Sequence, residues 1–245
     1  MAEQKLVTPY SDSETSKKSQ VTLMFDKIAP YYDNLNRILS LGIDVLWRRK
    51  AIRLLAKEHP LTILDIATGT ADLAIEAAHV IKPHKIIGLD ISANMLKIGD
   101  EKIINKGLKD IITLELGDSE NLKYETESFD AVMAAFGVRN FENLEKGLEE
   151  MFRVLKPGGT LMVLEFSKPK HFPLKQFFNV YFKNILPVIG KLRSKDDKAY
   201  KYLYESVQVF PDYNDFINIL IKIGYSKANF KVLSAGICCI YIAKK

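Results

Sequence analysis

The segment from Thr62 to Asp90 constrains the fold more than any other part of the chain. It contains a short apolar run, 62–66, then a turn of small residues around Gly69, helical spacing after Thr70, and a second apolar run that ends at Asp90. This order predicts a strand, a turn, a helix and a second, parallel strand, buried on both faces. Ligands of such sheets bind beyond the carboxyl ends of the strands, where small residues admit the ligand and an acid accepts ribose hydroxyls. Gly69 and Asp90 are therefore predicted to bind a nucleoside.

The residues of the turn 65–72 restrict which nucleoside-containing ligands could bind there. It lacks the Gly-x-Gly-x-x-Gly of dinucleotide sites and the Gly-Lys-Ser/Thr of phosphate loops, and it has an acid at each end, Asp65 and Asp72. Acids suit a ligand that carries ammonium and sulfonium charge, such as S-adenosylmethionine. The turn resembles the glycine-rich motif of class I S-adenosylmethionine-dependent methyltransferases, with Ala67 and Ala71 where that motif commonly has glycine. Taken alone, it could also be an ordinary strand-to-helix turn.

Three later strand signals follow in the order typical of those methyltransferases. Ile111–Leu116 leads into Gly-Asp-Ser, Phe129–Ala134 leads into a loop, and Leu-Lys-Pro-Gly-Gly precedes the strand 160–166. The resemblance implies that Asp118 and Ser119 contact the adenine, although an isolated Asp-Ser after a strand is usually only a turn. The agreement in order makes a methyltransferase the favoured interpretation.

The chain length and composition predict one α/β domain. With 245 residues, 47% of them apolar, the chain can bury a single large core. The resemblance implies a Rossmann-like, seven-stranded, mostly parallel sheet flanked by helices, with a helical cap at 21–58 and a helical insertion at about 170–213. Residues 1–20 are polar and are expected to be mobile in the free protein.

Other features of the composition argue against several classes of protein and of functional site. No run reaches the roughly 20 apolar residues of a membrane span, and no signal peptide is visible, so we expect a cytoplasmic protein. The four histidines have no metal-ligand spacing, so no metal is predicted. Cys238 and Cys239 are adjacent in a predicted strand, where one should face the core, and they indicate neither a disulfide nor a catalytic thiol. The net charge of +5 comes from dispersed lysines, which disfavours a nucleic-acid groove.

Segments outside the sheet should bind the methyl acceptor. The first, 21–47, has helical spacing as far as Pro30 and then two further predicted helices; the second, 136–141, follows the fourth strand and contains Arg139. The third, 170–213, holds ten of the twenty-five aromatic residues. Most of these aromatics should pack the helices onto the sheet, but the rest would suit a lid over an apolar substrate.

One helical stretch in this insertion has aromatic residues on two faces. Phe177 pairs with Tyr181, and Phe178 with Phe182, at a spacing of four residues. Only one face can meet the core, so the other is predicted to line a pocket, meet a second subunit or touch a membrane.

Two longer stretches, 32–47 and 153–167, and the Phe-Gly-Val-Arg-Asn sequence at 136–140 resemble the UbiE and MenG quinone C-methyltransferases. Leu35, Asp44 and Ala71 depart from the usual Met, His and Gly. Because Asp44 removes an imidazole from the cap, a catalytic histidine is not expected there. The resemblance carries over the cofactor positions Thr70, Asp90, Asp118 and Ser119, in addition to Asp65 and Gly69 of the glycine-rich motif. Ala135 stands where the family sometimes has a serine, so the contact of that hydroxyl is absent.

The resemblance implies methyl transfer from S-adenosylmethionine to a ring carbon of a prenylated quinol. Ionising one hydroxyl moves electron density onto the adjacent carbon, and we predict that Arg139 stabilises the resulting phenolate. Tyr32 or Asp33 in the cap could relay the proton, although both could equally have structural roles. A prenyl tail would fit the aromatic insertion, and the lysines would favour peripheral contact with the inner face of the membrane.

Several alternatives stay open from the sequence. The favoured acceptor is demethylmenaquinol, with 2-methoxy-6-polyprenyl-1,4-benzoquinol or another lipophilic small molecule as alternatives. A non-catalytic S-adenosylmethionine-binding module is disfavoured because Arg139 and Asp90 are retained. A homo-oligomer is a further alternative, because the second aromatic face could meet another subunit.

Overall fold

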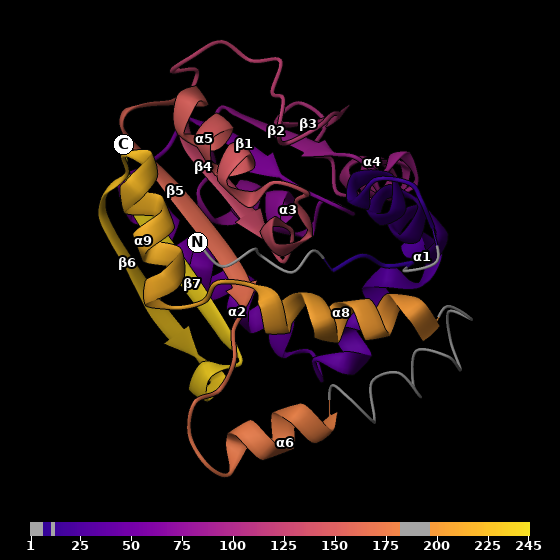
Figure 1. Cartoon of the computed structure of the whole chain (residues 1–245). Helices are drawn as coiled ribbons and strands as arrows, with labels where there is room; N and C mark the ends of the chain where they lie inside the picture. The colour runs from indigo at the N-terminus through magenta and orange to yellow at the C-terminus, as the bar shows by residue number, and fades with distance from the viewer. Residues whose placement is uncertain (1–6, 11–12, 182–196) are drawn as a thin grey trace.

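The computed structural model describes residues 7–10, 13–181 and 197–245. A seven-stranded sheet in the order β3-β2-β1-β4-β5-β7-β6 forms its centre, and β7 runs antiparallel to both of its neighbours (Figure 1). The strands are β1 (Thr62–Ile66), β2 (Lys85–Asp90), β3 (Ile112–Leu116), β4 (Phe129–Ala135), β5 (Leu155–Phe166), β6 (Ser226–Leu233) and β7 (Cys238–Lys244). The predicted seven-stranded, mostly parallel sheet is confirmed.

Helices cover both faces of the sheet. They are α1 (Lys17–Leu39), α2 (Ile43–Leu55), α3 (Asp72–Val80), α4 (Ala93–Asn105), α5 (Leu144–Val154), α6 (Leu174–Val180), α8 (Asp197–Val209) and α9 (Asn214–Ile223), with short 3-10 turns at Ala56–Glu58, Val138–Asn140 and Ser234–Gly236. Ile63 and Met133 pack with side chains of α2 and α3, whereas Leu64 and Val132 pack with side chains of α5 and α9. The two cores therefore follow the alternation of side chains along each strand. None of the helices in the described ranges is long and apolar enough to cross a bilayer.

Burial on both faces corrects the expectation for the adjacent cysteines. Cys238 and Cys239 are free thiols, and both are fully buried rather than one of the two. Cys238 belongs to the core on the α2–α3 side, and Cys239 to the core on the α5–α9 side. The reason is that the sheet is covered on both sides at β7.

Helix α1 is longer than the sequence predicts. It begins at Lys17, where Ser16 caps it by accepting from the backbone of Ser19, and it continues through Pro30 to Leu39. A proline cannot donate to the carbonyl four residues earlier, here that of Asp26. Asn94 of α4 donates to that carbonyl instead, at 3.2 Å. The helix break expected at Pro30 is therefore wrong, because a side chain distant in sequence supplies the missing hydrogen bond.

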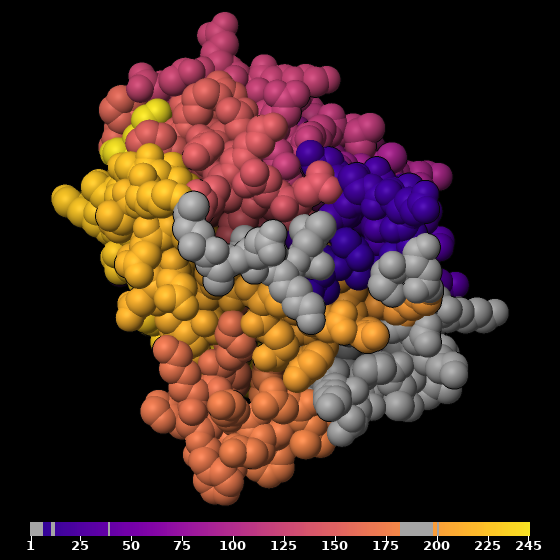
Figure 2. Space-filling model, viewed as in Figure 1, coloured from indigo at the N-terminus to yellow at the C-terminus, as the bar shows by residue number. Residues whose placement is uncertain are grey.

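The insertion and α1 form a third apolar cluster, beyond the carboxyl ends of the parallel strands. Val21 and Met24 of α1 are buried with Phe178 of α6 and Tyr202 of α8. In Figure 2 the indigo surface of α1 lies beside the orange surface of α8, and α6 forms the lower edge of the molecule. Phe177 is 68% exposed, as expected for the second aromatic face. Phe182 lies outside the described residues.

Candidate active site

The turn after β1 has the backbone conformation that favours glycine. Ala67, Gly69 and Ala71 have φ values of +54°, +56° and +64°. L-residues rarely adopt this region because the Cβ atom crowds the carbonyl oxygen, whereas glycine enters it at no steric cost. The positive φ values at positions 67 and 71 explain why the methyltransferase motif commonly has glycine there. This chain has alanine at both positions in the same conformation.

Asp90 and Gly69 meet at the carboxyl ends of β2 and β1. The Gly69 amide donates to Asp90 Oδ2 at 2.8 Å, and the Ser92 amide donates to Oδ1 at 2.9 Å. Burial raises the pKa of Asp90, and these backbone hydrogen bonds oppose the rise. Because each carboxylate oxygen has two lone pairs, Asp90 can still accept from ribose hydroxyls.

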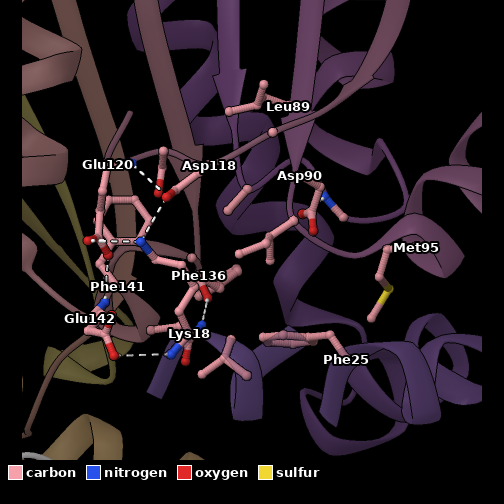
Figure 3. Close-up of a pocket in the computed structure, with 18 of the residues that line it drawn as sticks. Lys18, Phe25, Leu89, Asp90, Met95, Asp118, Glu120, Phe136, Phe141 and Glu142 are labelled. Atoms are coloured by element: carbon pink, nitrogen blue, oxygen red, sulfur yellow. Dashed lines mark hydrogen bonds and ion pairs between the residues drawn. The ribbon is translucent and has the colours of Figure 1, made fainter. Parts of the chain in front are cut away.

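Asp118 and Ser119 follow β3 and line the same cavity as Asp90. Lys18 of α1 forms ion pairs with Asp118 at 2.7 Å and with Glu120 at 3.3 Å. In Figure 3 these three residues lie on one side of the cavity, with Asp90 and Met95 on the other. The sequence analysis missed Lys18, because its segment shows no motif and reaches the cavity only through the path of α1.

Asp65 and Thr70 are not among the described residues that line this cavity. Asp65 is fully buried behind the turn and accepts a 2.6 Å hydrogen bond from the Thr68 hydroxyl. Burial raises the pKa of Asp65 to about 7. Thr70 donates to Asp33 at 2.6 Å and accepts from Lys102 at 3.1 Å. Both residues shape the turn from behind, so a direct cofactor contact for either stays a prediction.

The residues around this first cavity fit an adenosine-bearing cofactor. A Cβ atom on Gly69 would meet no heavy atom within 4 Å, which leaves open space beside the backbone. Asp90 and Asp118 supply acceptors for hydroxyl and amino groups, and Lys18 is the one cationic side chain in the described lining. An acidic lining with a single cation, already paired, disfavours a polyphosphate.

A second, larger cavity of about 440 Å³ adjoins the first. Side chains of α1, α2, α6 and α8 line it, and most of them are apolar. Asp44 lies in its wall and accepts from Ser40 at 2.7 Å and from Arg48 at 2.6 Å. At the position where the resembled family usually has histidine, this chain therefore has an ion-paired carboxylate.

Four residues line both cavities and form the boundary between them. They are Phe25, Tyr32, Phe136 and Asn140. Burial raises the pKa of Tyr32, opposed by a hydrogen bond with Asn36, so its hydroxyl is protonated at neutral pH. The sequence analysis identified Tyr32 as a candidate site residue. It did not predict that Phe25, Phe136 and Asn140 form a wall with Tyr32 between two cavities.

Arg139 lies in the wall of the second cavity, in the turn Val138–Asn140. Its Nη1 donates to Glu165 Oε1 at 2.9 Å and to the carbonyl of Phe136, and its guanidinium lies over the Phe166 ring at 5.4 Å. Burial raises the pKa of Glu165, and the charge of Arg139 opposes that rise. These contacts fix the cation at the cavity wall, beside the boundary residue Phe136.

Asp33, the alternative proton relay, has a different environment. Its carboxylate accepts from Thr70 at 2.6 Å and from Lys102 at 2.9 Å. It is not among the described residues that line either cavity. Across the ranges that the structure describes, no group of three or more His, Cys, Asp or Glu side chains could hold a metal ion.

Solved structures define the class of fold. The chain aligns with an S-adenosylmethionine-dependent methyltransferase of Thermotoga maritima at a TM-score of 0.61 and 19% identity, covering 91% of this chain and 99% of that one. The [4+2]-cyclase SpnF aligns at a TM-score of 0.59 and 17% identity, covering 93% and 96%. The fold is therefore that of class I methyltransferases, and SpnF shows that the fold alone does not determine the chemistry.

Sequence comparison defines the family. The ubiE/COQ5 methyltransferase family matches residues 13–245, and the chain belongs to this family. A demethylmenaquinone methyltransferase of Bacteroides fragilis is 47% identical, covering 99% of this chain and 98% of the relative. A protein of Geotalea daltonii named ubiquinone/menaquinone biosynthesis C-methyltransferase UbiE is 40% identical, covering 94% and 98%. Family membership confirms the predicted methyltransferase activity, with S-adenosylmethionine as the methyl donor.

Proposed function

We propose that this chain methylates a ring carbon of a prenylated quinol and that demethylmenaquinol is its acceptor. One structural observation carries the proposal: the first, acidic cavity and the second, apolar cavity share the wall formed by Phe25, Tyr32, Phe136 and Asn140. A donor in the first cavity and a ring in the second would meet at that wall. The near full-length relative named demethylmenaquinone methyltransferase supports the naphthoquinol over the benzoquinol.

The residues of the chain perform three tasks in this proposal. Asp90 and Asp118 bind the adenosine part of S-adenosylmethionine, which supplies an electrophilic methyl group when bound. The apolar wall of the second cavity excludes water and holds the ring near the boundary, which aligns the reacting carbon. Arg139 stabilises the phenolate that forms when one hydroxyl of the quinol ionises.

Tyr32 has a narrower role than the sequence suggested. A protonated tyrosine with a raised pKa is a poor proton acceptor but a good hydrogen-bond donor. It lies at the shared wall, where it can donate to a quinol oxygen and orient the ring. The hydroxyl proton leaves to solvent through the mouth of the cavity. Once the ring carbon has taken the methyl group, the hydrogen on that carbon leaves as a second proton, which restores the aromatic ring of the quinol.

The mouth of the second cavity suits a lipid surface. Leu41 is 85% exposed and Phe177 is 68% exposed, and both line the cavity. Phe172, just before α6, is 81% exposed. A prenylated acceptor resides in the bilayer, so a peripheral contact at this rim would let the tail pass into the cavity without crossing water.

The proposal is tested with reduced, short-tail demethylmenaquinol and methyl-labelled S-adenosylmethionine, with the product identified by mass spectrometry. We expect the wild-type protein to form menaquinol and to prefer it to the methoxy-benzoquinol by at least about tenfold in kcat/KM. If neither ring gains a methyl group, the proposed acceptor class is wrong.

Arg139→Leu tests the role of the cation. We expect kcat to fall about 100-fold, within the range for loss of one charge-stabilising group, with unchanged affinity for S-adenosylhomocysteine. Arg49→Leu is the matched control, since Arg49 is 52% exposed on α2 and pairs with Glu76. Because Arg139→Leu leaves Glu165 unpaired, the double variant Arg139→Leu/Glu165→Leu keeps the test valid if the single variant unfolds. Near-normal turnover in either variant would refute the role of Arg139.

A further inference from the structure

Two buried polar atoms at the second cavity lack a hydrogen-bond partner among the described residues. They are the Tyr202 hydroxyl and the Arg139 Nε. Both residues line the cavity, and Tyr202 is only 2% exposed. Most buried polar side-chain atoms in proteins are paired, so an unpaired one needs an explanation. Two unpaired donors in the wall of one cavity point to a ligand that accepts hydrogen bonds.

The Tyr202 hydroxyl lies within electrostatic reach of the ion pair between Arg139 and Glu165. The charges of Arg139 and Glu165 both act on it. Nη1 of Arg139 donates to Glu165 and to the Phe136 carbonyl. The ion pair between Arg139 and Glu165 therefore leaves Nε available as a donor. The other members of the Tyr202 cluster are mainly apolar, among them Met24 and Phe178. The hydroxyl and Nε are therefore polar groups in an otherwise apolar part of the wall.

The chemistry of the two donors specifies the group they would bind. Burial raises the pKa of Tyr202, so its hydroxyl stays protonated and can donate. The Arg139 Nε–H can only donate. A pair of donors beside a cation matches an oxygen that gains negative charge, as a phenol oxygen does when it ionises.

We infer that Tyr202 of the helical insertion is a second acceptor-binding residue, whose hydroxyl donates to a quinol oxygen beside Arg139. This inference rests on the proposed function and deepens it. The insertion then has a polar task besides covering the tail, because α8 carries a group that recognises the hydroxyl of the ring. A ring that lacks this oxygen would leave the Tyr202 hydroxyl and the Arg139 Nε unpaired. A ring whose oxygen is methylated cannot ionise and would place a methyl group against the two donors, so both rings would bind less well.

Tyr202→Phe removes only the hydroxyl, and Tyr204→Phe is its matched control. Tyr204 lies on the same helix, is partly buried, and is not in the described lining of either cavity. With short-tail demethylmenaquinol we expect Tyr202→Phe to lower kcat/KM by about 10-fold to 100-fold, as for loss of a hydrogen bond to a charged group. The affinity for S-adenosylhomocysteine and the melting temperature should stay close to those of the wild type.

The two monomethyl ethers of the quinol, used as inhibitors, separate recognition from packing. The wild-type protein should bind one ether at least about fivefold more weakly than the other, and Tyr202→Phe should lose that difference. The inference is overturned if Tyr202→Phe keeps kcat/KM within twofold of the wild type, or if it weakens binding of both ethers and the quinol equally.

A binding experiment keeps this test separate from that of the acceptor class. If the wild-type protein methylates no quinol, the proposed function fails, but the hydroxyl site can still be measured with 2-geranyl-1-naphthol and its methyl ether by ligand fluorescence. A preference for the naphthol that is lost in Tyr202→Phe and kept in Tyr204→Phe supports the site. An equal affinity of the wild-type protein for the two probes refutes it.

Discussion

Asp65 is a fully buried acid whose ionisation the fold opposes. Its pKa is raised to about 7 by burial, and the neighbouring charge of Asp90 adds to the rise. An acid with a raised pKa in the folded state favours folding most at low pH, where it is protonated in both states. Its contribution is lost as the pH rises from about 4 to about 7, because the unfolded chain ionises first.

Asp65→Asn should therefore change the pH dependence of stability. The amide keeps an oxygen that can accept from Thr68 and cannot ionise. We expect the melting temperature of the wild-type protein, relative to that of Asp65→Asn, to fall by at least about 5 °C between pH 4.5 and pH 7.5 and to level off above. Asp110→Asn, at an exposed site, is the control. Parallel curves for the wild type and Asp65→Asn would show that Asp65 is ionised throughout.

At the scale of elements, an ionic network ties α1 to the turn after β1. Lys102 of α4 donates to Asp33 of α1 at 2.9 Å and pairs with Asp72, the first residue of α3. Asp72 also pairs with Arg48 of α2 at 3.0 Å. Networks of partly buried charges contribute more than isolated surface pairs, because each member satisfies several others. The network links the cap helices, which line the second cavity, to the turn that borders the first.

Lys102→Met should loosen this connection. Without the cation, Asp33 and Asp72 lose a shared partner, so we expect a loss of about 1–2 kcal/mol in the free energy of unfolding, which shrinks at high salt. Affinity for S-adenosylhomocysteine should fall severalfold, because the turn is less well held. Lys109→Met is the control, since Lys109 pairs with Asp100 at 3.2 Å with both side chains about half exposed. Equal effects of the two variants, measured by chemical denaturation and calorimetry, would argue against a network.

Elements whose signals are local were predictable from the sequence, and those that depend on distant partners were not. The apolar run at 62–66 matches β1 to the residue. Asp90, which ends β2, and Asp118, which follows β3, lie at one edge because the strands are parallel. The continuity of α1 through Pro30 depends on Asn94, which belongs to another helix. The shared wall of the cavities likewise requires α1 to cross the strand ends, so no local pattern could reveal it.

At the scale of the whole molecule, the proposed route of a prenylated acceptor passes over the apolar rim of the second cavity. The exposed residues Leu41, Phe172 and Phe177 come from the α1–α2 connection and from the start of the insertion. Leu41 and Phe177 both line the second cavity, so two segments far apart in sequence contribute to its rim, and Phe172 precedes α6 by two residues. Burying one exposed phenylalanine in lipid contributes about 1.5–3 kcal/mol, which is enough for a single substitution to change vesicle binding measurably.

Phe172→Ser tests this rim without altering the cavity, because Phe172 is not in its described lining. We expect the fraction of protein that sediments with anionic phospholipid vesicles to fall at least about fivefold, since the lost apolar contact is not replaced. Turnover of a short-tail acceptor in detergent should not change, whereas turnover of a long-tail acceptor held in vesicles should decrease. Leu61→Ser is the matched control: Leu61 is 50% exposed and immediately precedes β1, at the edge of the sheet opposite the cavities. Unchanged vesicle binding in Phe172→Ser, or an equal loss in Leu61→Ser, would mean that the acceptor reaches the cavity without a lipid contact at this rim.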